Sequence, residues 1–223
     1  MRASCRKLPL AAAILAEVDA GRLTLDQRIR YGRADLLDTS PVTKAHVALG
    51  SLPVARLCAA AIQVSDNAAA NLLLARIGGP AGLTRFFRAA GDNVTRLDRT
   101  EMALNSNLPG DPRDTTSPAA MLGFMRAVLL GDMLSPASRA RLTGWMEGTT
   151  TGLARLRAGL PAGWRVGDKT GTGSGANNDI AIAFPPGRGP ILIASYTSGP
   201  VEDMAARNGV HADIARLVAA AFA

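Results

Sequence analysis

The sequence pattern changes from helical to β-rich near residue 164, and this change limits the folds that the chain can adopt. Helical patterns dominate before this point. After it come three β-rich segments, WRVGDKTGTG, NDIAIAFPP and GPILIASYTSG, separated by short turns rich in Gly, Asn and Pro. Turns this short join antiparallel neighbours, because parallel strands need a long crossover. The sequence therefore predicts an α+β fold in which an antiparallel meander follows a helical region.

The helical region is divided by clear start signals. Ser117-Pro118 and Ser135-Pro136 each combine a capping serine with a proline suited to the first helical position. Helices are expected over residues 4–20, 53–64 and 67–77, from Pro80 onward, after both Ser-Pro pairs, and at about 200–222.

Residues 93–117 lack a helical period. A loop this long inside a compact domain is usually functional or disordered. Four apolar side chains would allow it to pack on the rest of the protein: Leu97, Met102, Leu104 and Leu108. We therefore expect an ordered loop with a functional role.

The composition is that of a globular protein. The 223 residues are 48% hydrophobic and 19% charged, which suffices for a sizeable core and is far from the composition of a disordered chain. We predict a single domain with a helical lobe at about 4–148 and a sheet-plus-helix lobe at about 149–223.

The longest apolar run, residues 8–16, is about half the length that a membrane span needs. With basic residues before it and a possible cleavage site at 18–20, it imitates a secretory signal, although not convincingly. Cleavage there would remove Ser4 and Lys7, so a signal peptide would exclude any function for them.

The net charge of +7 raises the question of a nucleic-acid partner. The basic residues are scattered singly and only 4% of the residues are aromatic, so none is predicted. Only three of the 25 Lys and Arg residues are lysines: Lys7, Lys44 and Lys169. A lysine in so arginine-rich a chain is a candidate for a role that needs an amine able to lose its proton.

Cysteines and histidines are rare. Cys5 and Cys58 are too few for a zinc site, and the sequence leaves open whether they pair. His46 and His211 have no obvious partner in the sequence, so a Ser-His-Asp triad is not expected. Neither a phosphate loop nor a dinucleotide fingerprint occurs, and we expect no metal and no cofactor.

Four short motifs follow one another: S-x-x-K at 4–7, S-D-N at 65–67, R-x-E-x-x-L-N at 99–105 and K-T-G at 169–171. Each alone has a structural explanation; S-D-N, for example, is a good helix break and cap. Together, their order and spacing form a specific combination.

The chemistry of this combination begins with a serine hydroxyl, which is a poor nucleophile until a base removes its proton. Lys7, one helical turn after Ser4, could be that base if burial and Lys169 lower its pKa. Glu101 could act instead through a bridging water, and the choice stays open. A helix start at Ser4 would also offer a backbone N–H to a developing oxyanion.

S-x-x-K, S-D-N and K-T-G are together the signature of class A β-lactamases and penicillin-binding proteins. With the loop glutamate, the sequence resembles a class A serine β-lactamase from about residue 1 to the C-terminus. The resemblance implies hydrolysis of the β-lactam ring of antibiotics through an acyl-enzyme. The positions that match functional residues of the family are Ser4, Lys7, Ser65, Asn67, Arg99, Glu101, Asn105, Asp114, Lys169, Thr170, Gly171 and Thr172.

The resemblance implies the catalytic roles. Ser4 would form the acyl-enzyme, and Ser65 would pass a proton to the departing lactam nitrogen. Glu101 and Asn105 would hold the water that hydrolyses the acyl-enzyme.

The resemblance to the family also implies the binding and structural roles. Asn67 would hold the amide of the substrate's side chain, and Lys169 with Thr170 would bind its carboxylate. The backbone N–H of Thr172 would be the second oxyanion donor. A salt bridge from Arg99 to Asp114 would close the loop.

The sequence also departs from the family pattern. Members usually have a helix and two strands before the nucleophile's helix, whereas this chain starts three residues before Ser4. We therefore expect three of five strands and an open edge at 190–198. Arg6 stands where the family tends to hold an aromatic residue, so its guanidinium must reach solvent or an acid. Thr39 stands where an aromatic residue often flanks the cleft mouth.

Three alternatives stay open: a D,D-peptidase or penicillin-binding protein, a serine-dependent glutaminase of the same fold, and an inactive truncated remnant that binds β-lactams. The resemblance implies a periplasmic or secreted monomer that acts on a small β-lactam and contacts neither nucleic acid nor membrane.

Overall fold

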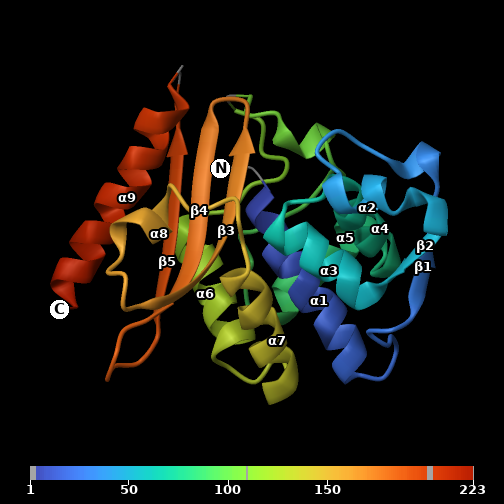
Figure 1. The fold of residues 1–223 in the computed structure, drawn as a ribbon, viewed down its shortest axis with the longest axis horizontal. Coiled ribbons are helices and arrows are strands. Elements are labelled where there is room, and N and C mark those ends of the chain that lie inside the picture. Colours follow the sequence, from blue (N-terminus) through green and yellow to red (C-terminus); the bar gives the residue numbers. More distant parts are fainter. Residues whose placement is uncertain (1–3, 109, 200–202, 223) are drawn as a thin grey trace.

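A three-stranded antiparallel sheet stands beside a group of helices (Figure 1). The computed structural model describes residues 4–108, 110–199 and 203–222, and of Ser4 it describes the backbone alone. The helices are α1 (Lys7–Asp19), α2 (Pro41–Ala45), α3 (Val54–Gln63), α4 (Asn67–Arg76), α5 (Gly79–Ala89), α6 (Pro118–Leu129), α7 (Pro136–Glu147), α8 (Leu156–Gly159) and α9 (Met204–Ala221). Four short 3-10 turns accompany them: η1 (Ser4–Arg6), η2 (Arg33–Asp35), η3 (Val47–Leu49) and η4 (Ala103–Asn105).

The sheet has the predicted antiparallel topology. Its strands are β3 (Arg165–Gly173), β4 (Ala176–Phe184) and β5 (Ile191–Ser198), in that spatial order, so β4 is central. Each pair of neighbours is joined by a short connection, as the sequence indicated. The prediction of an α+β fold with three strands is confirmed.

Alternate residues of the strands pack on opposite faces of the sheet. Ile180 and Ile182 of β4 belong to the main hydrophobic core, which extends through the helices. Ala181 and Ala183 belong to a second cluster, which α8 and α9 close. This alternation is the period of two that a sheet covered on both faces requires.

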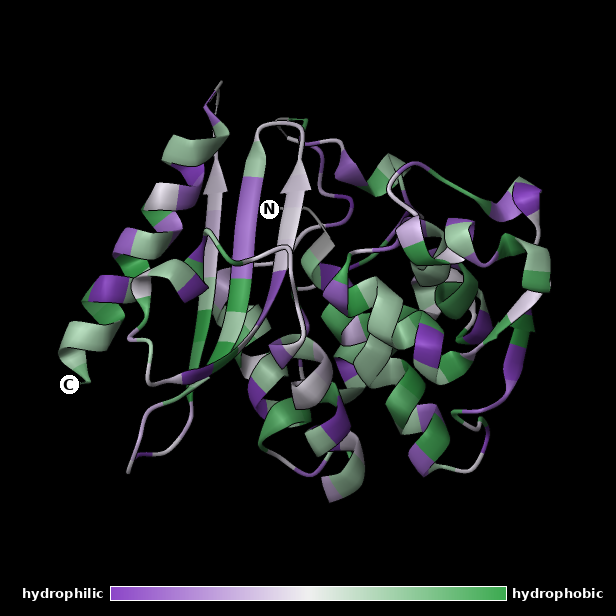
Figure 2. Cartoon of the chain, viewed as in Figure 1, coloured by the Kyte–Doolittle hydropathy of each residue, from purple (hydrophilic) through white to green (hydrophobic). Residues whose placement is uncertain are grey.

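One half of β4 is hydrophilic although it lies inside the protein. Figure 2 shows this half as a purple stretch near the upper end of the sheet. Asn177, Asn178 and Asp179 have no exposed surface there. In the register of the sheet, Asn177 pairs with Thr172 and Asp179 pairs with Thr170 of β3. The polar half of β4 therefore lies directly beside K-T-G on β3.

Helix α1 runs through the middle of the helical group. Its residues from Lys7 to Leu15 are all buried, and it contacts α3, α4, α5 and α7. A helix that is apolar all round is stable only inside a protein. It begins at Lys7 rather than at residue 4, because Pro9 has no N–H to donate to the carbonyl of Cys5. The buried helix therefore carries Lys7 into the interior.

Side-chain caps fix the starts of the neighbouring helices. Ser117 accepts a hydrogen bond from the N–H of Ala120, and Ser135 accepts one from the N–H of Ser138. The Ser-Pro pairs thus start α6 and α7 as the sequence predicted.

Sequence patterns did not indicate a small two-stranded ribbon, β1 (Arg28–Arg30) with β2 (Ser51–Pro53). Strands of three residues are too short for an alternating pattern to stand out. No helix in the described part of the chain is long and apolar enough to span a membrane.

Candidate active site

A cleft of about 410 Å³ opens where the helical group meets β3. It is lined by Thr39, Ser65, Asn67, Met102, Asn105, Thr151, Arg155, Thr170 and Thr172. The residues come from the segment before α2, from the S-D-N turn, from the loop after α5, from the segment between α7 and α8, and from β3. The fold therefore brings three of the four sequence motifs to one cleft.

The S-D-N turn is anchored by its middle residue. Asp66 is fully buried, caps α4 by accepting from the N–H of Ala69, and also accepts from the N–H and hydroxyl of Thr43. Ser65, directly before it, has a φ of 58°, which is unfavourable for a residue with a side chain. The anchor at Asp66 holds this conformation, and Ser65 lines the cleft.

Lys7 points at this turn from the start of α1. Its Nζ donates to Asn67 Oδ1 at 2.6 Å, to the Ser65 carbonyl at 2.8 Å and to Ser65 Oγ at 3.1 Å. The same Nζ lies 3.3 Å from Glu101 Oε1. Burial lowers the pKa of Lys7, and the charge of Glu101 opposes this shift.

Lys169 also contacts the hydroxyl of Ser65. Its Nζ donates to Ser65 Oγ at 3.2 Å and to the Thr170 carbonyl at 2.7 Å. Burial and the charge of Lys7 lower the pKa of Lys169 to about 8. The Ser65 hydroxyl therefore accepts hydrogen bonds from two amines.

The loop glutamate is held by its backbone and by its side chain. The N–H of Glu101 donates to Asn71 Oδ1, and Asn71 Nδ2 donates to the Glu101 carbonyl, both at 3.0 Å. Asn105 Nδ2 donates to Glu101 Oε2 at 2.9 Å. These contacts fix one carboxylate oxygen near Asn105 and the other near Lys7.

The two ends of the loop are joined by an ion pair and by hydrogen bonds to one carboxylate. Arg99 Nε lies 2.5 Å from Asp114 Oδ2, and the backbone N–H groups of Asp98 and Arg99 donate to Asp114 Oδ1. Asp114 has no exposed surface. A carboxylate with several charge-assisted hydrogen bonds is a strong anchor, so Asp114 holds the two ends of the loop together.

The loop also touches β3 closely. The N–H of Ser174 donates to the carbonyl of Asn105 at 3.1 Å. A Cβ atom at Gly173 would lie 2.7 Å from the same carbonyl, closer than side chains tolerate. The absence of a side chain at Gly173 therefore allows Asn105 to approach the strand.

Arg155 lines the cleft and was not singled out from the sequence. Its guanidinium donates to Thr172 Oγ1 and to the Asn178 carbonyl, both at 2.7 Å, and to the Gly171 carbonyl at 3.4 Å. Thr151, which was also missed, is 2.8 Å from Thr170 through its hydroxyl. No local pattern distinguishes this arginine from the others of the chain. Asn71 could have been found, since it follows Asn67 by one helical turn and lies on the same face of α4.

Ser4 begins η1, directly before α1, but its side chain lies outside the described part of the structure. Cys5, next to it, donates its thiol to the carbonyl of Lys169 at 3.3 Å, and burial raises the pKa of this thiol to about 12. The contact joins the S-x-x-K turn to K-T-G. Cys5 and Cys58 are both buried and free, which answers the question of their pairing.

His211, for which the sequence offered no partner, has two in the structure. Its Nδ1 lies 2.7 Å from Ser195 Oγ, and its Nε2 lies 3.1 Å from the carbonyl of Asn177. His46 Nδ1 contacts the carbonyl of Val42 at 2.8 Å. The partners of His211 come from β4 and β5, which are brought to α9 only by the fold. Among the described residues, no group of His, Cys, Asp and Glu could hold a metal ion.

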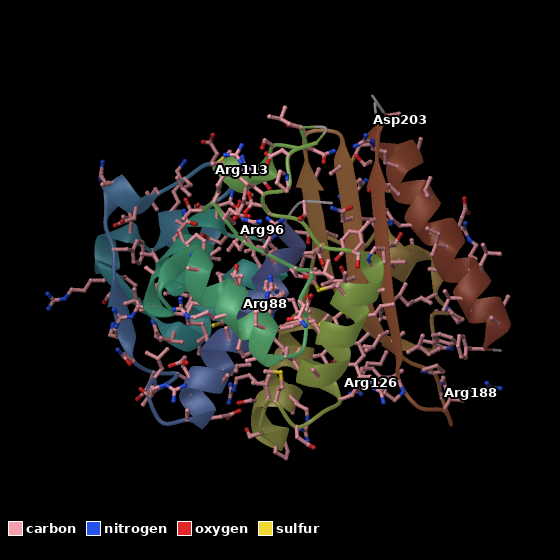
Figure 3. The ribbon with its side chains drawn as sticks, turned by 180° about the vertical axis from the view of Figure 1, so that it is seen from behind. Arg88, Arg96, Arg113, Arg126, Arg188 and Asp203 are labelled. Carbon is pink, nitrogen blue, oxygen red and sulfur yellow. The ribbon has the colours of Figure 1, made fainter. Side chains whose placement is uncertain are left out.

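The arginines on the far side of the molecule come from separate elements (Figure 3). Arg88 is on α5, Arg126 on α6 and Arg188 on the connection between β4 and β5, and all three are exposed. Arg113 pairs with Asp111 at 3.0 Å. The positive charge of this side is therefore distributed and partly neutralised.

Comparison with known proteins gives one consistent family. The model of the Beta-lactamase enzyme family matches residues 2–222. Beta-lactamase CTX-M-8 of Citrobacter amalonaticus is 45% identical over 216 residues, 96% of this chain and 74% of that protein. The carbapenem-hydrolyzing β-lactamase KPC of Klebsiella oxytoca is 49% identical over 210 residues, 93% of this chain and 71% of that protein.

Solved structures agree with this result. The class A β-lactamase of the last common ancestor of Gram-negative bacteria superposes with a TM-score of 0.97 at 59% identity, covering 99% of this chain and 84% of that one. A related ancestral class A enzyme gives a TM-score of 0.96 at 57% identity, with 98% and 84% covered. By sequence, fold and the arrangement of its motifs, the chain belongs to the class A β-lactamase family.

Proposed function

We propose that this protein hydrolyses the β-lactam ring of antibiotics through an acyl-enzyme on Ser4. One observation carries the proposal: the amines of Lys7 and Lys169 converge on the Ser65 hydroxyl, and the carboxylate of Glu101 pairs with Lys7, three residues after Ser4. These groups are buried, so their charges act with little screening by water. The chain acts as one catalytic domain, with a helical lobe at about 4–148 and a sheet-plus-helix lobe at about 149–223.

Acylation joins Ser4 to the carbonyl carbon of the ring. The serine oxygen adds to that carbon, the C–N bond of the ring breaks, and the nitrogen takes a proton through Ser65. The proton of Ser4 passes either to Lys7 directly or to Glu101 through a water. Lys7 donates hydrogen bonds to Ser65 at both its hydroxyl and its carbonyl, which supports a proton path along these residues.

Deacylation uses the loop. Glu101 and Asn105 hold a water, Glu101 accepts its proton, and the resulting hydroxide adds to the acyl carbon. The ester bond to Ser4 then breaks, and the Ser4 oxygen takes back the proton that Glu101 holds. The hydrogen bond from Asn105 Nδ2 to Glu101 Oε2 supports this step, because it orients the carboxylate beside the cleft. A carboxylate oriented to hold this water favours a β-lactamase over a D,D-peptidase. The function of a D,D-peptidase does not require rapid hydrolysis of the penicilloyl adduct.

The cleft walls bind the substrate. Lys169 and Thr170, with Gly171 beside them, hold its carboxylate, and the nearby Arg155 adds a second positive charge. The backbone N–H groups of Ser4 and Thr172 stabilise the oxyanion. Asn67 accepts from Lys7 and donates to the carbonyl of Asp38, so it is oriented before it meets the side-chain amide of the substrate.

Further expectations follow from the family. We propose that the substrate is a small β-lactam, that the protein acts as a monomer outside the cytoplasmic membrane, and that it needs no cofactor, no nucleic acid and no membrane contact.

The proposal is tested with purified protein and the chromogenic β-lactam nitrocefin. The wild type should turn over many equivalents, and Ser4→Ala should abolish turnover. Ser51→Ala is the matched control, since Ser51 lies on β2 away from the cleft and accepts from Arg28. Equal hydrolysis by the wild type and Ser4→Ala would overturn the proposal. After exposure to benzylpenicillin, a penicilloyl adduct that persists for hours on the wild type would show a D,D-peptidase instead.

A further inference from the structure

Arg6 is a buried cation between two parts of the active site. It lies in η1, two residues after Ser4, and is 5% exposed. Its Nη1 atom is 4.0 Å from Asp114 Oδ1, at the closed base of the loop. Neither Nη1 nor Nη2 has a hydrogen-bond partner in the described part of the chain. Arg6 thus reaches an acid, as expected from the sequence, but makes no hydrogen bond to it.

Such a group is costly for folding. A buried guanidinium loses its hydration, and only well-formed hydrogen bonds compensate for that loss. Burial accordingly lowers the pKa of Arg6, while the carboxylates of Asp114 and Glu101 oppose the shift. An apolar side chain of similar size would avoid this cost. The cost suggests that the charge serves the site rather than stability.

The second carboxylate near Arg6 is the catalytic one. Arg6 and Glu101 both line a small space of about 20 Å³, together with Lys7 and Asn71. A space of this size has room for about one water molecule. Arg6 therefore lies near the carboxylate that closes the loop and also lines the small space beside Glu101.

We infer that Arg6 is a positioning residue: its buried charge ties the turn that carries Ser4 to the base of the loop that carries Glu101. The inference rests on the proposed function, because in that reaction the Ser4 acyl group and the water at Glu101 must be held in a fixed position relative to each other. Arg99 already pairs with Asp114 from within the loop. Arg6 adds a link from outside the loop to the same carboxylate, so its loss should loosen the loop relative to Ser4 and weaken the hydrogen bonds that Asp114 accepts from Asp98 and Arg99.

The kinetic test separates deacylation from acylation. Arg6→Met should lower kcat and KM together by about tenfold or more, because a small displacement of a catalytic group has effects of this size. The value of kcat/KM should stay within about twofold, since it reports acylation alone. Arg6→Lys keeps the charge and should recover most of kcat. Arg22→Met is the matched control, since Arg22 is an exposed arginine paired with Glu17, and its kinetics should equal those of the wild type.

A purely structural role predicts a different result. In that case kcat and kcat/KM would fall by the same factor, in proportion to the loss of folded protein, and this would overturn the inference. Unchanged kcat in Arg6→Met would overturn it as well. If Arg6→Met does not fold, Arg6→Gln, which is neutral but polar, takes its place with the same expectations.

Hydrogen exchange gives a readout that does not depend on turnover. The amides of Asp98 and Arg99 donate to Asp114, so they should exchange faster in Arg6→Met than in Arg22→Met. Equal exchange in the two variants would overturn the anchoring role even if the wild type hydrolyses nitrocefin. If the wild type does not, the proposed function fails, and the exchange rates still decide the role of Arg6.

Discussion

The Nζ atom of Lys7 lies 3.3 Å from the Oε1 atom of Glu101, and the two side chains are 2% and 4% exposed. Helix α1 supplies the amine and the loop after α5 supplies the carboxylate. Each charge offsets the cost of burying the other, so both side chains can lie inside the protein. In the proposed reaction, each member of the pair is a candidate base for the proton of Ser4.

The first prediction concerns the stability of this pair. Lys7→Met leaves the carboxylate of Glu101 buried without its cation, which should cost about 3 kcal/mol of unfolding free energy. Glu101→Gln should cost a similar amount. The double variant should cost less than the sum, because it removes both charges. Urea unfolding measures the three values, and strictly additive costs would show that the two groups do not interact.

The second prediction concerns alkaline pH. Because the pKa of Lys169 is lowered to about 8, its amine loses its proton as the pH rises through that value. It then no longer attracts the carboxylate of the substrate, so kcat/KM should fall above about pH 8. Lys169→Arg keeps its charge and should lack this fall, whatever its absolute rate. An identical alkaline limb in both proteins would assign the titration to another group.

The third prediction concerns acid. Burial lowers the pKa of His211 to about 4, whereas an exposed histidine in the unfolded chain keeps its ordinary value of 6.5. Between these values the unfolded state binds the proton and the folded state does not, so stability falls as the pH falls. The wild type should lose more stability from pH 7 to pH 5 than His211→Gln, which does not titrate. If the urea midpoint of unfolding fell equally in the two proteins between pH 7 and pH 5, this prediction would be wrong.

The fourth prediction concerns the contact between the loop and β3. Gly173→Ala puts a Cβ atom 2.7 Å from the Asn105 carbonyl, so the loop must move. Hydrolysis of the acyl-enzyme should slow more than its formation, because Asn105 holds Glu101. Gly163→Ala is the matched control, since a Cβ atom there meets nothing within 4 Å. Rapid-mixing kinetics with equal rates in both variants would show that the contact has no role.

Much of the fold could be predicted because its signals are local. The cap at Ser117 and the short turns between β3, β4 and β5 are each encoded within a few residues. The ribbon of β1 and β2 was missed, since its strands of three residues depend on pairing across the intervening chain. The start of α1 at Lys7 was misplaced by three residues, although Pro9 contained the information.

Residues of the candidate site could be selected from the sequence where the proposed chemistry needs rare residue types in a fixed order. Lys7 and Lys169 stand out in a chain with 25 basic residues of which only three are lysines. Arg155 does not stand out, and its contacts with Thr172 and Asn178 arise only when β3 and β4 pair. His211 is similar, because Ser195 and Asn177 reach it from other elements. Long-range contacts of common residues leave no pattern along the chain.

The most direct test of the account is mass spectrometry of Glu101→Gln after brief exposure to benzylpenicillin. General-base catalysis is worth about 10²- to 10⁴-fold, so removal of the base should trap the acyl-enzyme. The account predicts one penicilloyl group per chain on the peptide that contains Ser4. An adduct on any other residue, or no adduct on a folded protein that still hydrolyses nitrocefin, would contradict it.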